Sequence, residues 1–573
     1  MIVSLPLRRS RAGFSLARIS LRNGKASLLF SLILYLGIGS YLSLVLQAFQ
    51  GDAYSRVANA YYVLFSRDPH LAAIGFVWTP LPSLVELLFM PVSLVWPPMV
   101  RDGFAAVLMS ALFMAGAVYQ IDKTMRELQV RSVARNVLVA AFALNPMVVY
   151  HGAIGTSEAP MAFFMILCAR HLMAWTRHGT IDRLVLAGLA LAGAYMTRYE
   201  AALAAAGAVG IVGLLVLLRT PGPPRTRFQM ATADALILGA PFVLVFVAWA
   251  FASWLIVGDA FAQFSSAYGN SSQIAVWKSI GGNEFGYPLD LKLSLTAQRL
   301  FALQAALPLG LALALVLSVS RRDLRMVALL AVFGPALVFM ALAYVLGVLA
   351  PWLRYLMPAV PLGILLLGLC LSGAVAVARP SWPSRMVGRW AGPAMTPMLL
   401  LGAAITVPIG GMGILNSQIA VEESRDLGGI FGPRAAHDDR PGWSVRSFAG
   451  ERIVAAHLDT LQLPDGSVAL DVFLNGFAIV TQSDSPRQFV ITPDRDFDAI
   501  LADPAAFGVQ YLLAPDNAGQ GVLDAVNRAY PGLVPSEPSA PRSGHRVATL
   551  DRMFPQLGTS GRWWLFRVNP PVS

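Results

Sequence analysis

A carboxylate and a guanidinium just after the first long apolar segment are the residues of this chain best suited to chemistry. Asp52 and Arg56 lie one helical turn apart, directly after the apolar run 26–48. Such charges beside hydrocarbon are costly unless they are paired or functional. The stretch 51–82, which also contains the aromatic and proline-rich segment around Trp78, is therefore the first candidate for a site.

Further charged and aromatic residues follow later apolar runs, and the expected topology brings them to the same membrane face. They are Glu158 in GTSEAP, Arg198, Tyr199 and Glu200 in MTRYEA, Lys278 in a long polar segment, and Arg354 with Tyr355 in PWLRYLMPAVP. A cluster of this kind can hold an anionic group at the depth of lipid headgroups while a carboxylate acts on a neutral partner.

Structural interpretations stand beside the chemical one. Asp52 and Arg56 could form a local i, i+4 helix pair. Arg198 and Arg354 could extend towards lipid phosphates. Glu158 could simply stabilise the start of a helix through the helix dipole. The clustering of these residues, more than any one of them, favours a functional site.

Aromatic and histidine side chains have the same two interpretations. Trp78 fits an interfacial aromatic belt as well as a platform for a sugar. His70 and His151 are isolated in the sequence, so metal ligation by either is disfavoured. A divalent cation is left open as a cofactor, because no dedicated ligand cluster is visible.

Composition places the chain in a membrane. Of its 573 residues, 56% are hydrophobic and only 13% are charged, and the mean hydropathy is +0.60. Soluble domains carry about 25% charged residues. The net charge of +11 is concentrated in short loops between apolar runs. The positive-inside rule explains that pattern, and nucleic acid is not an expected partner.

The apolar runs predict about 11 membrane-spanning helices. They lie near 26–48, 104–121, 134–150, 157–175, 184–197, 200–218, 232–257, 299–319, 326–349, 356–378 and 394–415. The basic loops are 122–135, 170–183, 219–227, 321–325 and 379–389. Their charge places the N-terminus in the cytoplasm and, with an odd number of spans, the C-terminal region outside.

We expect three parts. Residues 1–25 form a basic cytoplasmic N-terminus, residues 26–418 a transmembrane catalytic domain, and residues 419–573 a small extracytoplasmic α/β domain. The transmembrane domain has a first outer loop at 50–103 and a second long outer loop at 258–298. Within the first loop, the proline-broken segment 81–100 favours an interfacial helix over a span.

The α/β domain is predicted from alternating short elements. Helices are expected at 451–461, 497–501 and 523–530, and strands at 468–473, 477–481, 489–492, 509–514 and 563–568. This region has no glycine-rich phosphate loop and no nucleophile elbow. It is expected to position a substrate or stabilise the fold.

Over residues 26–415 the chain resembles the GT-C superfamily of membrane glycosyltransferases. The likeness is to bacterial relatives of the protein O-mannosyltransferases and of the lipid A aminoarabinose and galacturonic acid transferases. It rests on GDAYSR after the first span, GFVWTPLPSL downstream, the acidic TSEAP, and RYLMPAVP near the last spans. One departure is that the mannosyltransferases have Asp-Glu where this chain has Asp52-Ala53.

The resemblance implies transfer of a hexosyl or pentosyl group from a polyprenyl-phosphate donor, outside the cytoplasmic (inner) membrane, to a glycan, lipid or protein. It implies that Asp52 is the essential first-loop carboxylate. It also implies that Arg354 holds the carrier phosphate, together with Arg198, Arg56 or Lys278. The chemistry then predicts an inverting displacement with Asp52 as base.

The remaining site residues are assigned from their places in the cluster. Glu158 is expected to orient the acceptor or to help bind a cation, and Tyr355 to lie beside the carrier phosphate. Trp78, Tyr199 and Glu200 are expected to contact the sugar or the acceptor. A multi-span transporter or flippase for a lipid-linked substrate is the alternative, although internal repeats and mid-span charges are typical of that class.

Overall fold

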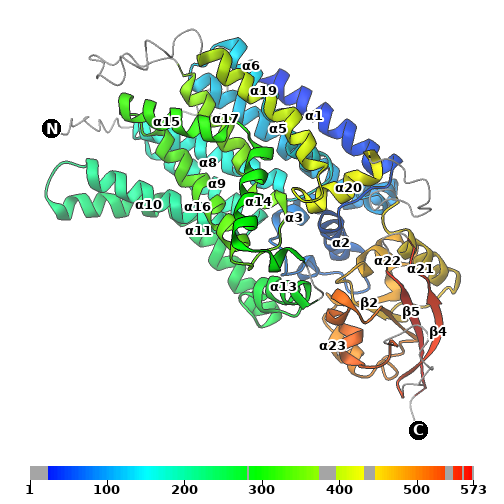
Figure 1. Cartoon of the computed structure of the whole chain (residues 1–573). Helices are drawn as coiled ribbons and strands as arrows, with labels where there is room; N and C mark the ends of the chain where they lie inside the picture. The colour runs from blue at the N-terminus through cyan, green and yellow to red at the C-terminus, as the bar shows by residue number, and fades with distance from the viewer. Residues whose placement is uncertain are drawn as a thin grey trace.

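A bundle of long apolar helices makes up most of the molecule, and a small sheet domain lies at one end of it (Figure 1). The computed structural model describes residues 24–279, 283–372, 395–431, 446–535, 546–557 and 561–570. Most of the expected N-terminal region 1–25 and the basic loop 379–389 lie outside these ranges.

Eight helices within those ranges are long and apolar enough to cross a membrane, or up to ten if two bent pairs each count as one span. The eight are α1 (Lys25–Ser40) with η1 (Tyr41–Val45), α5 (Phe104–Glu127), α8 (Glu158–His178), α10 (Ala201–Arg219), α11 (Pro224–Val257), α16 (Arg325–Val345), η5 (Leu353–Leu356) with α17 (Ala359–Cys370), and α19 (Met395–Ile414). The chain is therefore a multi-pass membrane protein with fewer qualifying spans than the 11 segments predicted.

The difference comes from three of the predicted segments. The segments 134–150 and 299–319 fold as bent pairs, α6 (Ser132–Ala143) with α7 (Pro146–Ala153), and α14 (Leu289–Leu303) with α15 (Leu307–Arg321). The bends are 56° and 79°. The third segment is α9 (Ile181–Thr197), a helix of 17 residues. Proline at the start of α7 and in the first turn of α15 favours a new helix over continuation of the old one.

The two long loops also contain helices. The expected interfacial helix 81–100 is divided into α3 (Leu81–Leu87), η3 (Met90–Leu94) and α4 (Pro98–Arg101), and none of these is long enough to span. The second loop contains α12 (Ala262–Ser265), α13 (Asn270–Ser279) and η4 (Asn283–Gly286) before α14 begins.

The C-terminal region forms one five-stranded sheet in the order β2-β1-β3-β5-β4. The strands are β1 (Val468–Leu470), β2 (Phe489–Ile491), β3 (Tyr511–Pro515), β4 (Ala548–Phe554) and β5 (Trp563–Val568). The first three are parallel, and β5 and β4 are antiparallel to their neighbours. Its helices are α21 (Ala449–Thr460), α22 (Gly476–Gln482), α23 (Phe497–Ala502) and α24 (Ala525–Ala529), with η6 (Pro486–Gln488) and η7 (Gly519–Leu523).

One prediction within this region is wrong, and one strand was not predicted. The segment 477–481, expected as a strand, belongs to helix α22, and β4 was not predicted. The run FAIVT is apolar except for its final threonine and is entirely buried, so its periodicity cannot distinguish a strand from a buried helix. The strand β4 is mostly exposed at the sheet edge and lacks a clear apolar alternation.

Helix α2 (Gly51–Phe65) connects the two parts of the molecule. Its Ala53 and Val57 pack with apolar residues from the end of the first loop and the start of α5, whereas Tyr54 and Tyr62 lie in the core of the sheet domain. The hydroxyl of Tyr54 lies 2.9 Å from that of Thr481 on α22. The helix that carries Asp52 is therefore fixed by both domains.

Candidate active site

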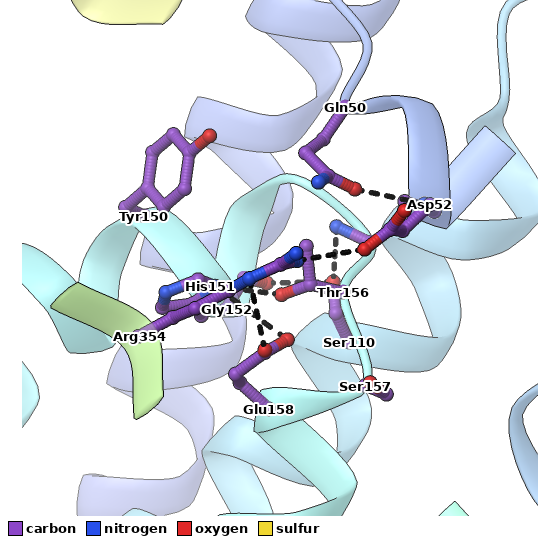
Figure 2. A network of polar contacts seen from close by, with 12 residues as sticks. Gln50, Asp52, Ser110, Tyr150, His151, Gly152, Thr156, Ser157, Glu158 and Arg354 are labelled. Carbon is purple, nitrogen blue, oxygen red and sulfur yellow. Dashed lines mark hydrogen bonds and ion pairs between the residues drawn. The ribbon is translucent and has the colours of Figure 1, made fainter. Parts of the chain in front are cut away.

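Arg354 lies at the centre of the candidate site and faces three carboxylates, two of which, Asp52 and Glu158, are seen in Figure 2. Its Nη1 lies 2.9 Å from Oδ2 of Asp52, and its Nε lies 3.1 Å from Oε2 of Glu422 and 3.9 Å from Oε1 of Glu158. These groups come from η5, α2, α8 and the helix α20 (Val421–Phe431). The guanidinium is also 4.4 Å from the ring centre of Trp352. Arg354 is buried, so this arrangement concentrates charge where water is scarce.

Local structure explains where Asp52 lies. Gln50 caps α2 by accepting a hydrogen bond from the backbone N–H of Ala53. The Nε2 of Gln50 donates to Glu422 at 2.9 Å. Arg56, one turn later, donates to the backbone carbonyl of Asp52 at 2.9 Å, and its guanidinium lies 4.7 Å from the ring centre of Trp78. The first turn of α2 is therefore held from both sides.

Electrostatics keep Asp52 ionised. Burial by itself would raise the pKa of this carboxyl, but the guanidinium groups of Arg354 and Arg56 outweigh burial and hold the pKa below its ordinary value. The side chain of Asp52 is 29% exposed, so it can still reach a substrate. Asp52 is thus an ionised carboxylate at the edge of a cavity.

The start of α8 depends on a tight turn after α7. Gly155 has φ +90° in this turn, a conformation that favours glycine, and an added Cβ would meet the Cβ of Ala106 at 2.4 Å. The N–H of Gly155 donates to Ser110, and Nδ1 of His151 lies 2.8 Å from Oγ1 of Thr156. The turn thereby aims Glu158 at Arg354 (Figure 2) and at Arg198.

Arg198 is the second cation of the site, and its side chain is mostly buried. Its Nη1 lies 2.5 Å from Glu158 and its Nη2 lies 2.6 Å from Glu200. The guanidinium also lies 5.7 Å from the ring centre of Tyr355. Arg198 and Arg354 therefore share Glu158 between them and stand close enough to act on one anion.

Two cavities meet at these arginines. One, of about 620 Å³, is polar and is lined by Asp52, Arg56, Val77, Trp78, Thr79, Thr197, Arg198, Tyr199, Glu200, Gln263, Asn270, Gln273, Trp352, Arg354 and Tyr355. The other, of about 520 Å³, is mostly apolar and is lined by Glu158, Met161, Ala162, Met165, Arg198, Glu200, Phe333, Ala336, Met340, Arg354, Tyr355, Met357, Pro358 and Pro361. Arg198, Glu200, Arg354 and Tyr355 belong to both. A substrate with an apolar tail, a polar head and an anionic group between them matches the apolar cavity, the polar cavity and the two arginines that they share.

The structure brings together nine of the ten predicted site residues. Every one except Lys278 lines one or both cavities. Lys278 is exposed on α13, and its Nζ lies 5.6 Å from the ring centre of Phe285. Asn270 and Gln273 of the same helix line the polar cavity in its place.

Sequence reasoning missed the acidic helix α20. Glu422 contacts Arg354, and Asp426 accepts a hydrogen bond of 2.5 Å from the hydroxyl of Tyr150. Glu423 is fully buried, and among the described residues neither of its side-chain oxygens has a hydrogen-bond partner. Burial is the main reason that the pKa of Glu423 rises to about 7. Two adjacent glutamates directly after the last apolar run were the available signal.

The arrangement of carboxylates and histidines bears on whether the site holds a metal ion. Within the described ranges there is no group of three or more His, Cys, Asp or Glu side chains placed to hold an ion. Guanidinium groups already neutralise Asp52 and Glu158. The residues present therefore do not fit a metal centre, and no step below depends on one.

No family model matches the sequence, and no curated protein matches it. Solved structures do resemble it. ArnT from Cupriavidus metallidurans bound to undecaprenyl phosphate is 13% identical, with a TM-score of 0.47 over 95% of this chain and 97% of that chain. The archaeal oligosaccharyltransferase AglB from Archaeoglobus fulgidus, in complex with an inhibitory peptide and a dolichol-phosphate, is 12% identical. Its TM-score is 0.42 over 86% of this chain and 70% of that chain.

A third neighbour is the arabinofuranosyltransferase AftD from Mycobacteria. It is 16% identical, with a TM-score of 0.42 over 96% of this chain and 42% of that chain. These three neighbours are GT-C glycosyltransferases, the superfamily that the four sequence motifs resemble.

Proposed function

We propose that this protein is an inverting glycosyltransferase that moves a sugar from a polyprenyl-phosphate donor to a hydroxyl acceptor. The observation that carries the proposal is the junction of the two cavities at Arg198 and Arg354. An isoprenoid chain suits the apolar cavity, a phosphate suits the two guanidiniums, and a sugar suits the polar cavity. Guanidinium groups match phosphate oxygens in both charge and geometry.

In the proposed reaction, the bond between the anomeric carbon and the phosphate oxygen breaks and its electron pair leaves with the phosphate. Arg354 and Arg198 stabilise the developing negative charge. The acceptor oxygen forms the new bond to the anomeric carbon from the opposite side, while Asp52 takes its proton. One displacement of this kind inverts the anomeric centre and requires no second, nucleophilic carboxylate.

The carboxylates around Arg354 would occupy its N–H groups until a donor phosphate replaces them. Without a donor, Asp52 and Glu422 neutralise Arg354. A donor phosphate would compete for the same N–H groups and release Asp52 to face the acceptor. Glu158 would keep Arg198 in place, because it contacts that guanidinium from the opposite helix.

The remaining assignments are also proposals. Trp78, Tyr199 and Glu200 line the polar cavity where the sugar or acceptor would bind, and Arg56 positions Asp52. We place this cavity, the two outer loops and the α/β domain on the outer face of the cytoplasmic membrane, with the N-terminus inside. The α/β domain would then hold α2 and its Asp52 from the outside.

The test is transfer by the purified protein in lipid, offered a panel of polyprenyl-phosphate sugars. Asp52→Asn is assayed beside the wild type, and binding of the radiolabelled carrier is measured in both. Transfer by the wild type, lost in the variant while carrier binding persists, supports the reaction and the base together. Equal transfer by both would remove Asp52 from the mechanism. Movement of labelled lipid across the bilayer without any transfer would instead favour the flippase alternative.

A further inference from the structure

A basic cavity lies at the other end of the helix bundle from Asp52 and Arg354. It measures about 600 Å³ and is lined by Thr124, Glu127, Leu128, Arg170, Met173, Ala174, Arg177, His178, Arg183 and Arg325. Four of these ten residues are arginines, and Glu127 is the one carboxylate among them. The cavity therefore has a net positive lining that the proposed transfer reaction does not use.

Four helices run between this cavity and the candidate active site. Along α8, Glu158 and Arg177 are separated by roughly 28 Å at 1.5 Å per residue. That distance is close to the thickness of the hydrocarbon layer, about 30 Å. The helices α5, α9 and α16 span the same interval, and each contributes a residue to the basic cavity at its far end. The two sites thus lie at opposite membrane boundaries.

Buried contacts fix the back of the basic cavity. Arg170 is buried, with its Nε 2.9 Å from Oε2 of Glu127 and its Nη1 3.1 Å from Oε1 of Gln120. Arg325 is also buried and is paired with Asp323 at 2.5 Å. These two guanidiniums are held in one orientation, so they cannot simply turn away into water.

The front of the cavity is open. Arg177 is exposed at the end of α8, and Arg183 is half-buried at the start of α9. The Nη1 of Arg183 lies 3.3 Å from Nδ1 of His171, and its Nε lies 3.4 Å from Oδ2 of Asp182. Fixed guanidiniums behind and accessible ones in front form a pocket that an anion can enter.

We propose that this cavity binds a phosphate-bearing anion at the membrane face opposite the active site. Arginine forks bind phosphate oxygens in pairs. Basic pockets between membrane helices bind lipid headgroups. Leu128, Met173 and Ala174 give the cavity an apolar side, which suits the glycerol and upper acyl carbons of a phospholipid. A soluble diphosphate carries the same phosphate chemistry, and the experiment separates the two sources.

The test uses the full-length protein purified in detergent and two probes. Native mass spectrometry measures retention of phosphatidylglycerol against phosphatidylcholine, and thermal shift measures stabilisation by inorganic pyrophosphate. The variant R177Q/R183Q removes the two accessible arginines and leaves the buried ones in place. The control R131Q/R225Q removes two exposed arginines that lie at the same end of the bundle but outside the cavity.

We expect the wild type to retain phosphatidylglycerol and R177Q/R183Q to hold it roughly 30-fold more weakly, with the control unchanged. Stabilisation by pyrophosphate without lipid selectivity, lost in the same variant, would also support the site and assign it to a soluble diphosphate. Binding of neither probe would overturn the proposal. Equal weakening in both double variants would overturn it too, because that is the result of general surface charge. None of these results depends on sugar transfer.

Discussion

Two clusters of buried carboxylates in this molecule differ in how their oxygens are satisfied. In the sheet domain, Asp471 accepts hydrogen bonds from the hydroxyls of Tyr268 and Thr492, both at 2.7 Å. The backbone N–H groups of Phe473 and Ala525 donate to it at 2.9 and 2.7 Å. Each of its oxygens therefore has two donors, and the cluster is complete without a ligand.

The cluster around Arg354 is incomplete. Among the described residues, Oε2 of Glu158, Nε2 of His151 and both oxygens of Glu423 are buried without a hydrogen-bond partner. Buried polar groups are normally satisfied, and exceptions mark strained or functional sites. The comparison teaches that burial of charge alone does not identify an active site. Several unsatisfied atoms gathered around Arg354 set this cluster apart from the carboxylate of Asp471, and four predictions test that difference.

The largest effect is expected for Arg354→Gln. Transfer should fall by about 10²–10³-fold, because the developing phosphate charge loses a preorganised donor. The turnover number is measured at saturating donor. Arg67→Gln, which removes a partner of Asp494 in the sheet domain, is the matched control and should leave turnover unchanged. A turnover number as high in Arg354→Gln as in the control would contradict the assignment.

Asp471→Asn changes the carboxylate whose oxygens are all hydrogen-bonded, and it should lower the stability of the folded protein. The amide places an N–H₂ group opposite two donors, and we expect a loss of about 1–3 kcal/mol in the free energy of unfolding. Thermal unfolding in detergent measures it. Donor affinity should change little in protein that remains folded, whereas a selective loss of donor binding would mean that this cluster also has a direct role.

A smaller loss is expected for Tyr268→Phe. This change removes the hydrogen bond that Tyr268 donates to Asp471, worth about 0.5–1.5 kcal/mol, and the one that it accepts from the exposed Arg528. Because α13 of that loop lines the polar cavity, the KM for acceptor should rise while kcat is retained. Steady-state kinetics with varied acceptor separate the two parameters. An unchanged KM would show that the loop is placed by other contacts.

The smallest effect concerns pH and Glu423. Burial raises the pKa of this side chain from 4.5 to about 7, and Glu422, Asp426, Glu158 and Arg354 are the charged groups that face it. A raised folded pKa stabilises the folded state at low pH, and that stability is lost as the pH rises through the folded pKa. Protection of α20 from hydrogen exchange should therefore decrease between about pH 5 and pH 7. Glu423→Gln should flatten this dependence, and an unaltered pH profile would show that other groups cause it.

The sequence predicts much of this architecture because the dominant signal is local. Apolar runs of spanning length and basic loops locate most of the bundle, and Asp52, Glu158, Arg198 and Arg354 each stand at the end of such a run. Charge at a helix end beside hydrocarbon needs a reason, so these residues stand out individually.

The contacts between distant segments were not predictable in this way. Glu422 lies 372 residues from Gln50, to which it is hydrogen-bonded, and nothing in either neighbourhood indicates the other. The inclusion of Tyr54 in the core of the sheet domain is likewise a long-range result. Helix α22 was mistaken for a strand because short, fully buried apolar runs lack a period that separates the two.

The residues shared by the two cavities have a consequence for how the ligand specificity of such a protein can change. Arg198, Glu200, Arg354 and Tyr355 face both compartments, whereas Met161 and Phe333 face only the apolar one. Trp78, Asn270 and Gln273 face only the polar one. Substitutions on either side can then alter one ligand without disturbing the other. Under the proposed function, carrier preference and acceptor preference become separately adjustable traits, and the loop that lines the polar cavity could be exchanged without altering the apolar one.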